Sequence, residues 1–220
     1  VIGTPEVLAV LNREHFLQYL TAHYAARNVI VVVAGNVEPK AVFPNVARWF
    51  GGFTDGEAQG KPPVREEQRE PAVLIHRKET DQVHLDIGVR GYHLSHPDRH
   101  AQQLLSVLLG AGMSSRLFLA VRERQGLAYR VRSYSVESTD AGYVFTYAGT
   151  DPTRVERTIE TIIREYRRIR DEAVPAAELQ KVKDFARGHF LMDLESSDVM
   201  ASFVATQEAP TFSDCRIICS

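Results

Sequence analysis

The sequence predicts an α+β protein in which helices pack on one face of an antiparallel sheet. Residues 83–89 and 129–136 alternate between apolar and polar side chains, which is typical of strands with one buried face. Segments with helical periodicity follow each pair of strands. The strands are expected in adjacent pairs and so are the helices. This order favours a sheet layer covered on one face by a separate layer of helices.

The composition excludes some partners. Of the 220 residues, 44% are hydrophobic and 25% are charged, which is typical of a soluble globular protein. The net charge of −2 offers no basic excess for a nucleic-acid backbone, and no apolar run suits a membrane span. The chain begins VIGTPE without a basic or apolar leader, which indicates a cut or processed piece of a longer polypeptide. Cytoplasm and periplasm both remain open as the compartment.

The two cysteines, Cys215 and Cys219, lie close together near the end of the chain. They cannot form an internal disulfide framework for the fold, and their role remains open.

The first fifty residues predict three helices and one strand. Thr4 followed by Pro5 favours the start of a helix, and Asn12 can cap a second one. Residues 29–34 form a continuous apolar run, which is typical of a strand buried on both faces. The apolar pattern of residues 42–50 indicates a third helix. Residues 51–71 are then rich in Gly, Pro and charge, which indicates a linker without a binding role.

After the linker, residues 72–78 are expected to form a strand that pairs as a hairpin with residues 83–89. Asp98 can cap the following helix. A second antiparallel pair is expected from residues 129–136 and 143–147. Helices are expected to begin at Pro152, at Pro175 and at about Ser197, as apolar residues recur there at helical spacing.

The stretch from Gly110 to Tyr129, GAGMSSRLFLAVRERQGLAY, holds the candidate site. Ser114 is expected to cap a short helix, and Gly126 is expected to end it in the left-handed conformation. Arg122 falls off the helix face that carries the buried apolar residues. A reversal after this helix can bring the Arg122 guanidinium and the Tyr129 hydroxyl to one rim, where both can donate to one carbonyl oxygen.

The motifs SSRLF, VRE and GLAY in this stretch resemble the second-domain signature of the pitrilysin/insulinase family of zinc peptidases, which includes the mitochondrial processing peptidases. GTPE at residues 3–6 and NVIVVVAGNV at residues 28–37 are similar to the end of that family's first domain. The resemblance implies two tandem domains folded like a clam shell. It also implies that Arg122 and Tyr129 contact a bound peptide opposite the zinc ion.

The resemblance divides the chain into four parts. Residues 1–57 correspond to the C-terminal part of a first peptidase-like domain and residues 58–71 to a linker. Residues 72–212 correspond to the N-terminal and central part of a second, metal-free domain, and residues 213–220 are a tail. The residues after Glu208 are expected to supply neither a helix nor a strand. Residues 4–50 either supply these elements to the second domain or form a separate partial domain.

A zinc site would need the family's His-x-x-Glu-His, with two imidazoles on one helix face and a glutamate as base. None of the eight histidines belongs to that motif. His93, His96 and His100 come closest in spacing, but Pro97 and a preceding loop argue against one continuous helix. We therefore expect no metal and no cofactor bound by this chain, and no catalytic residue in it.

The resemblance implies that zinc sits in a partner domain or subunit. The chain is then the substrate-binding portion of a zinc metallopeptidase, inactive alone, with an extended peptide as substrate and a possible homo- or hetero-dimeric assembly. The alternative is a structural scaffold subunit, since relatives of this fold serve as non-catalytic core proteins of a respiratory complex.

Overall fold

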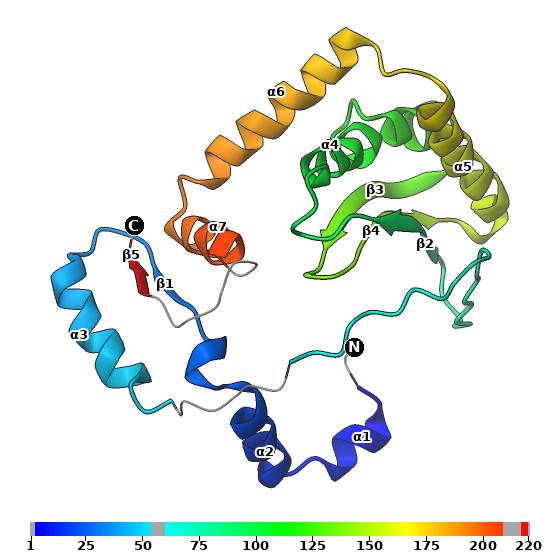
Figure 1. Ribbon diagram of the computed structural model, residues 1–220. Helices are drawn as coiled ribbons and strands as arrows, with labels where there is room; N and C mark the ends of the chain where they lie inside the picture. The colour runs from blue at the N-terminus through cyan, green and yellow to red at the C-terminus, as the bar shows by residue number, and fades with distance from the viewer. Residues whose placement is uncertain (1–2, 54–59, 209–216, 220) are drawn as a thin grey trace. The chain divides into compact units, whose positions relative to one another are not determined.

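The computed structural model describes residues 3–53 and 60–208, together with the backbone of 217–219 (Figure 1). The chain divides into two compact units, one made of Val1–Pro62 with Met192–Ser220 and the other of Pro63–Leu191. The predicted domain boundaries at residues 57, 71 and 212 stay a prediction.

The unit Pro63–Leu191 is built on a three-stranded antiparallel sheet. Strands β2 (Val83–Gly91) and β3 (Ala128–Glu137) both pair with β4 (Gly142–Thr150), so that β4 is central. Val83 lies opposite Thr150, and Glu137 lies opposite Gly142. Strand β2 follows the predicted alternation of buried and exposed residues from Val83 to Ile87, whereas Val89 is 51% exposed.

Helices cover one face of this sheet. Helix α4 (Arg99–Gly110) packs on β3, and α5 (Val155–Asp171) packs on β4 (Figure 1). Helix α6 (Ala176–Asp193) follows α5 in the chain, as the sequence predicted from Pro175. The predicted α+β class with helices on one side of an antiparallel sheet is confirmed.

The core lies between the sheet and these helices. Its centre is formed by Leu117, Val121 and Ile162, each 0% exposed. Around them pack Leu109, Leu127, Ala128, Val131 and Ala148. Burying a large aliphatic side chain contributes about 1.5–3 kcal/mol, so this cluster is the main source of stability in the unit.

The predicted strand at residues 72–78 is wrong. These residues form no regular element, and the side chains of Val73, Leu74 and Ile75 are 85%, 97% and 72% exposed. A strand forms only where a neighbouring strand accepts its backbone hydrogen bonds, and an apolar run cannot show by itself that such a neighbour is present.

The other unit contains α1 (Pro5–Val10), α2 (Arg13–His23), a 3₁₀ turn (Ala26–Asn28), β1 (Val31–Val33), α3 (Pro39–Phe50), α7 (Ser197–Glu208) and β5 (Ile217–Cys219). The caps predicted at Thr4 and Asn12 are confirmed, since Thr4 Oγ1 accepts from the Val7 amide at 3.5 Å and Asn12 Oδ1 accepts from the His15 amide at 3.2 Å. The cap predicted at Asp98 is wrong, since the Asp98 side chain makes no capping hydrogen bond at the start of α4.

The expectation that no strand follows Glu208 is also wrong. Backbone of Ile217–Cys219 pairs in parallel with Val31–Val33. The partner strand is far away in the sequence, so local composition gives no sign of this pairing. Cys215 lies outside the described residues, as does most of the predicted tail.

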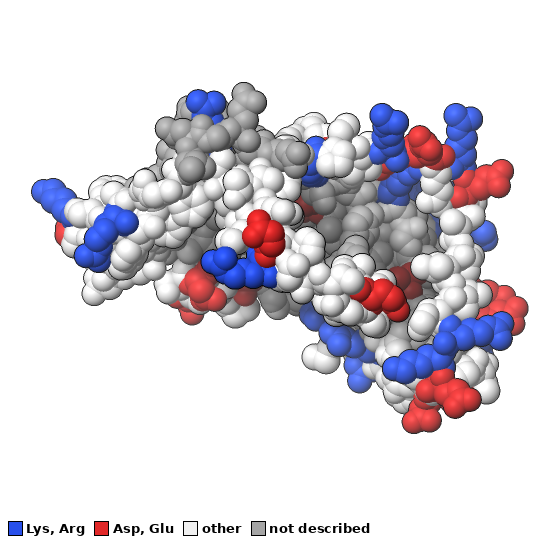
Figure 2. All heavy atoms as spheres, turned by 90° about the horizontal axis from the view of Figure 1, so that it is seen from below, with Lys and Arg blue, Asp and Glu red and all other residues white. Residues whose placement is uncertain are grey.

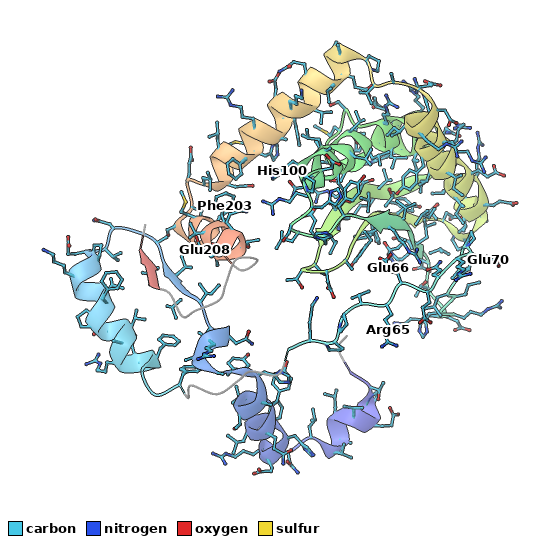
Figure 3. The ribbon with its side chains drawn as sticks, viewed as in Figure 1. Arg65, Glu66, Glu70, His100, Phe203 and Glu208 are labelled. Carbon is cyan, nitrogen blue, oxygen red and sulfur yellow. The ribbon has the colours of Figure 1, made fainter. Side chains whose placement is uncertain are left out.

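The linker is attached to the sheet of the unit Pro63–Leu191. The Val64 amide donates to Asp140 Oδ2 at 3.0 Å, and Arg90 Nε lies 3.4 Å from Glu66 Oε2. Arg90 Nη2 also donates to the Gln68 carbonyl. Figure 3 labels Glu66 and Glu70 on this segment, which runs past β2.

Candidate functional site

The stretch from Gly110 to Tyr129 begins where α4 meets β3. A Cβ atom on Gly110 would lie 2.4 Å from the Ser133 amide nitrogen, so only glycine permits this close approach. After a turn, the chain forms a short π-helix over Phe118–Glu123. In it the Arg124 amide reaches back to the Leu119 carbonyl at 3.0 Å. Such π-helical turns are often found at functional sites.

The prediction that Ser114 caps this helix is wrong. The π-helix has no side-chain cap, and the Ser115 hydroxyl donates to the Gly112 carbonyl at 2.6 Å. The Ser115 amide bonds to the same carbonyl at 3.0 Å, so a backbone turn positions the start of the helix. A serine hydroxyl can bond to a nearby carbonyl as readily as to a free amide, and spacing alone does not distinguish the two.

The reversal after the π-helix is fixed by backbone hydrogen bonds. Gly126 has a φ of +59°, as predicted for a left-handed end. Its amide donates to the Arg122 carbonyl at 3.0 Å, and the Leu127 amide donates to the Val121 carbonyl at 2.8 Å. Arg154, which lies at the start of α5, donates through Nη1 to the Gly126 carbonyl at 2.5 Å. Hydrogen bonds within the turn and from Arg154 therefore fix the backbone between Arg122 and the start of β3.

Arg122 is exposed, while Leu117, Ala120 and Val121 of the same turn are buried. The Arg122 guanidinium carbon lies 5.0 Å from the centre of the Phe118 ring. This contact orients the guanidinium group and leaves its N–H donors free.

Tyr129 is 62% exposed and sits at a β-bulge. Ala128 lies opposite Thr150 and Arg130 lies opposite Gly149, so Tyr129 is an extra residue on β3. The alternation of apolar and polar residues did not predict this bulge, because a bulge depends on how the partner strand pairs.

A surface pocket of about 420 Å³ adjoins these residues. It is lined by the end of α4, by Phe118 and Arg122 of the π-helix, by Arg130–Arg132 of β3, and by Phe185 and His189 of α6. Tyr129 directly precedes the β3 residues that line the pocket. Arg122 and Arg130, the residue that follows Tyr129, thus line the same pocket.

Arg116 was not predicted to have a role, yet it is the best-paired arginine in this stretch. It is 8% exposed, and its Nε and Nη2 donate to the two carboxylate oxygens of Glu178 at 2.8 and 2.7 Å. Hydrogen bonding from Arg116 holds the pKa of Glu178 below its ordinary value. The pair fixes the start of α6, the helix that supplies Phe185 and His189 to the pocket.

The histidine cluster does not fit a zinc ion. His96 Nδ1 accepts from the Asp98 amide at 3.0 Å, and its ring stacks on Tyr92 at 3.8 Å between centroids. His100 Nδ1 lies 3.0 Å from Gln103 Oε1 at the start of α4, where Figure 3 labels it. Among the residues that the structure describes, no group of three or more His, Cys, Asp or Glu could hold a metal ion.

No helix within residues 3–53 and 60–208 is long and apolar enough to cross a membrane.

The fold is of the α+β class, with helices on one face of an antiparallel sheet. The family model described as "Peptidase M16 inactive domain" matches residues 11–185. The chain therefore belongs to the M16 peptidase family.

The curated relatives are zinc proteases by name. The uncharacterized zinc protease YmxG of Bacillus subtilis is 34% identical over 201 residues, which cover 90% of this chain and 48% of the relative. An uncharacterized zinc protease of Rickettsia bellii is 31% identical over 196 residues, which cover 89% of this chain and 47% of the relative. The chain thus spans about half the length of these relatives.

Solved structures share the fold. A protease from Helicobacter pylori superposes with a TM-score of 0.84 at 23% identity and covers 96% of this chain and 52% of its own. An M16 inactive-domain protein from Pseudomonas fluorescens superposes at 0.82 with 19% identity, over 96% of this chain and 50% of its own. A chain of complex III from Candida albicans superposes at 0.73 with 18% identity, over 95% of this chain and 51% of its own.

Proposed function

We propose that this chain is the non-catalytic, substrate-binding portion of a pitrilysin-like zinc metallopeptidase. It completes the peptide site of a zinc-bearing domain or subunit. Membership of the M16 family and the names of the curated relatives support this function. The chain spans about half of those relatives, which leaves room for a zinc-bearing half in the same polypeptide or in another.

The observation that carries the proposal is the exposure of Arg122 and Tyr129 at the two ends of one rigid reversal. Each presents hydrogen-bond donors to solvent from a backbone that is fixed by hydrogen bonds. Such donors can fix the register of a bound peptide through its carbonyl oxygens. Donors held where negative charge develops also stabilise the transition state.

The test uses the part of the B. subtilis zinc protease that this chain does not match, produced as a separate polypeptide and loaded with zinc. Mixed with this chain, it is expected to hydrolyse an internally quenched fluorescent peptide. Arg122→Ala and Tyr129→Phe are each expected to lower kcat/KM on the order of a hundredfold, as for loss of one positioned donor. Neither protein alone is expected to show this turnover.

The matched control is Arg157→Ala, which removes an exposed arginine of α5 outside the pocket. It is expected to leave turnover unchanged. Circular dichroism and Tm confirm that each variant folds. Turnover that is insensitive to both Arg122→Ala and Tyr129→Phe would show that these residues do not bind the peptide.

The second candidate function is a structural scaffold without a peptide site. It is favoured by the fold shared with a chain of complex III. A scaffold is expected to form a stable complex with a partner subunit and to show no turnover in the mixing experiment, whatever residue stands at positions 122 and 129.

A further inference from the structure

Three arginines meet at the pocket beside the π-helix. Arg122 comes from the π-helix, and Arg130 and Arg132 come from β3. No Asp or Glu is among the residues that line this pocket. Within the part of the chain that the structure describes, none of the three guanidinium groups forms an ion pair.

Four other arginines of this unit do have acidic partners. Arg90, Arg116, Arg168 and Arg170 lie within 3.4, 2.7, 2.9 and 2.6 Å of a carboxylate oxygen. On the face seen in Figure 2, basic and acidic side chains are also interspersed. Arg122, Arg130 and Arg132 together give this pocket a positive field, which attracts an anion.

Aromatic rings orient two of the guanidinium groups. Arg122 lies over Phe118 at 5.0 Å and Arg130 lies over Tyr147 at 5.8 Å from guanidinium carbon to ring centroid. A guanidinium that rests on a ring face keeps its N–H fork free at the edge. Such forks match the two oxygens of a carboxylate, which accepts paired hydrogen bonds from arginine.

The pocket also adjoins a strand edge. Strand β3 pairs with β4 on one side, and the described residues supply no strand to its other side. Three consecutive residues, Arg130–Arg132, line the pocket although their side chains alternate between the sheet faces. The pocket therefore lies along the free edge, where an extended peptide can pair with the backbone.

We propose that this pocket binds a carboxylate of the peptide substrate, supplied either by an acidic side chain or by the C-terminal carboxyl group. The inference rests on the proposed peptide-binding function and adds a substrate class to it. Arg130 and Arg132 select the carboxylate, while Arg122 and Tyr129 hold the peptide carbonyl. Phe118 and Phe185 form the apolar wall against which the neighbouring peptide residue packs.

Fluorescence anisotropy with the whole 220-residue chain tests the proposal. The probes are labelled ten-residue peptides rich in Val and Thr that carry Glu or Gln at the centre, each with a free or an amidated C-terminus. The Glu peptide with an amidated end is expected to bind about tenfold more tightly than its Gln counterpart if side chains are selected. The Gln peptide with a free end is expected to show this gain instead if the terminus is selected.

Arg130→Gln and Arg132→Gln keep most of the apolar stem and remove the charge. Each is expected to bring the affinity ratio of acidic to neutral peptide close to one. Arg132→Lys, which keeps the charge but lacks the fork, is expected to retain part of the ratio. Arg157→Gln on α5 is the matched control and is expected to keep the full ratio, and Tm measurements verify folding of every variant.

The outcomes separate this inference from the function on which it rests. If all four peptides bind equally, and Arg122→Ala or Tyr129→Phe weakens them all, the peptide-binding function stands and carboxylate selection is overturned. If no peptide binds at millimolar concentration, the carboxylate site in this pocket is overturned, whereas the proposed function is decided by the turnover of the mixed proteins. A ratio that survives in both Arg130→Gln and Arg132→Gln also overturns the assignment to this pocket.

Discussion

At the scale of single residues, contacts between distant parts of the chain position the candidate site. The pairing of Arg116 with Glu178 was not predictable, since the partners are 62 residues apart and nothing local links them. The exposure of Tyr129 likewise depends on a bulge that the partner strand imposes. The spacing therefore predicted the exposure of Arg122 but not the contacts that position the surrounding stretch.

Replacing Glu178 by Gln tests the buried pair. The change leaves the Arg116 guanidinium, 7% exposed, without its carboxylate. We expect the free energy of unfolding at pH 7 to fall by about 1.5–3 kcal/mol, the usual contribution of hydrogen bonds to charged groups. Urea unfolding measures the change, with Glu160→Gln on the exposed side of α5 as control.

The pH dependence of this effect has a defined sign. Hydrogen bonding from Arg116 lowers the pKa of Glu178 from its ordinary value of 4.5. The stabilisation is therefore complete above pH 4.5 and is lost as pH falls through the lowered folded value. The difference between wild type and Glu178→Gln is expected to shrink in acid, and a difference that stays constant down to about pH 3 would contradict the carboxylate's role.

At the scale of elements, the three strands of the sheet and the helices α4, α5 and α6 were predictable from periodicity. The segment 72–78 was mispredicted because its apolar run lacks a neighbouring strand.

A chain of hydrogen bonds between the sheet and α5 joins four elements, β2, β3, β4 and α5, and the sequence pattern does not reveal it. Ser133 Oγ lies 2.7 Å from Thr146 Oγ1, which lies 2.6 Å from the Tyr166 hydroxyl, and that hydroxyl donates to the Ile87 carbonyl at 3.2 Å.

Removing the Tyr166 hydroxyl tests this chain. Burial raises the pKa of Tyr166, so the hydroxyl keeps its proton at neutral pH. Tyr166→Phe is expected to lower the free energy of unfolding by about 1–2 kcal/mol, because Thr146 loses a partner in the core. Tyr134→Phe on β3, which removes a hydroxyl with no such network, is expected to change stability much less under the same urea titration.

At the scale of the whole molecule, the sequence predicted two parts joined by a linker. It predicted neither the grouping of residues 192–220 with the first part nor the attachment of the linker to the sheet. A segment rich in Gly, Pro and charge was predicted to be a solvated connector. Instead, residues 64–68 bond to Asp140 and Arg90 of the sheet layer. Arg90 and Asp140 thus attach the connector to the unit Pro63–Leu191.

Arg90→Gln is expected to release the linker. Trypsin cleavage after Arg65 and Arg69, followed by mass spectrometry, is expected to become about two- to fivefold faster, because the hydrogen bond and ion pair that Arg90 makes are exposed and weak. Arg157→Gln is expected to leave the cleavage rate unchanged. Equal rates in all three proteins would mean that Arg90 does not hold the segment.

The bulge on β3 has a consequence for how the chain can vary in length. Without Tyr129, Ala128 and Arg130 would be neighbours opposite Thr150 and Gly149, as in a regular ladder. Loss of that one position would therefore flip no later side chain to the other side of the sheet. A related chain that is one residue shorter here can keep the same sheet while lacking the phenol. The extra residue therefore changes which side chain the surface presents and leaves the pairing of the strands unchanged.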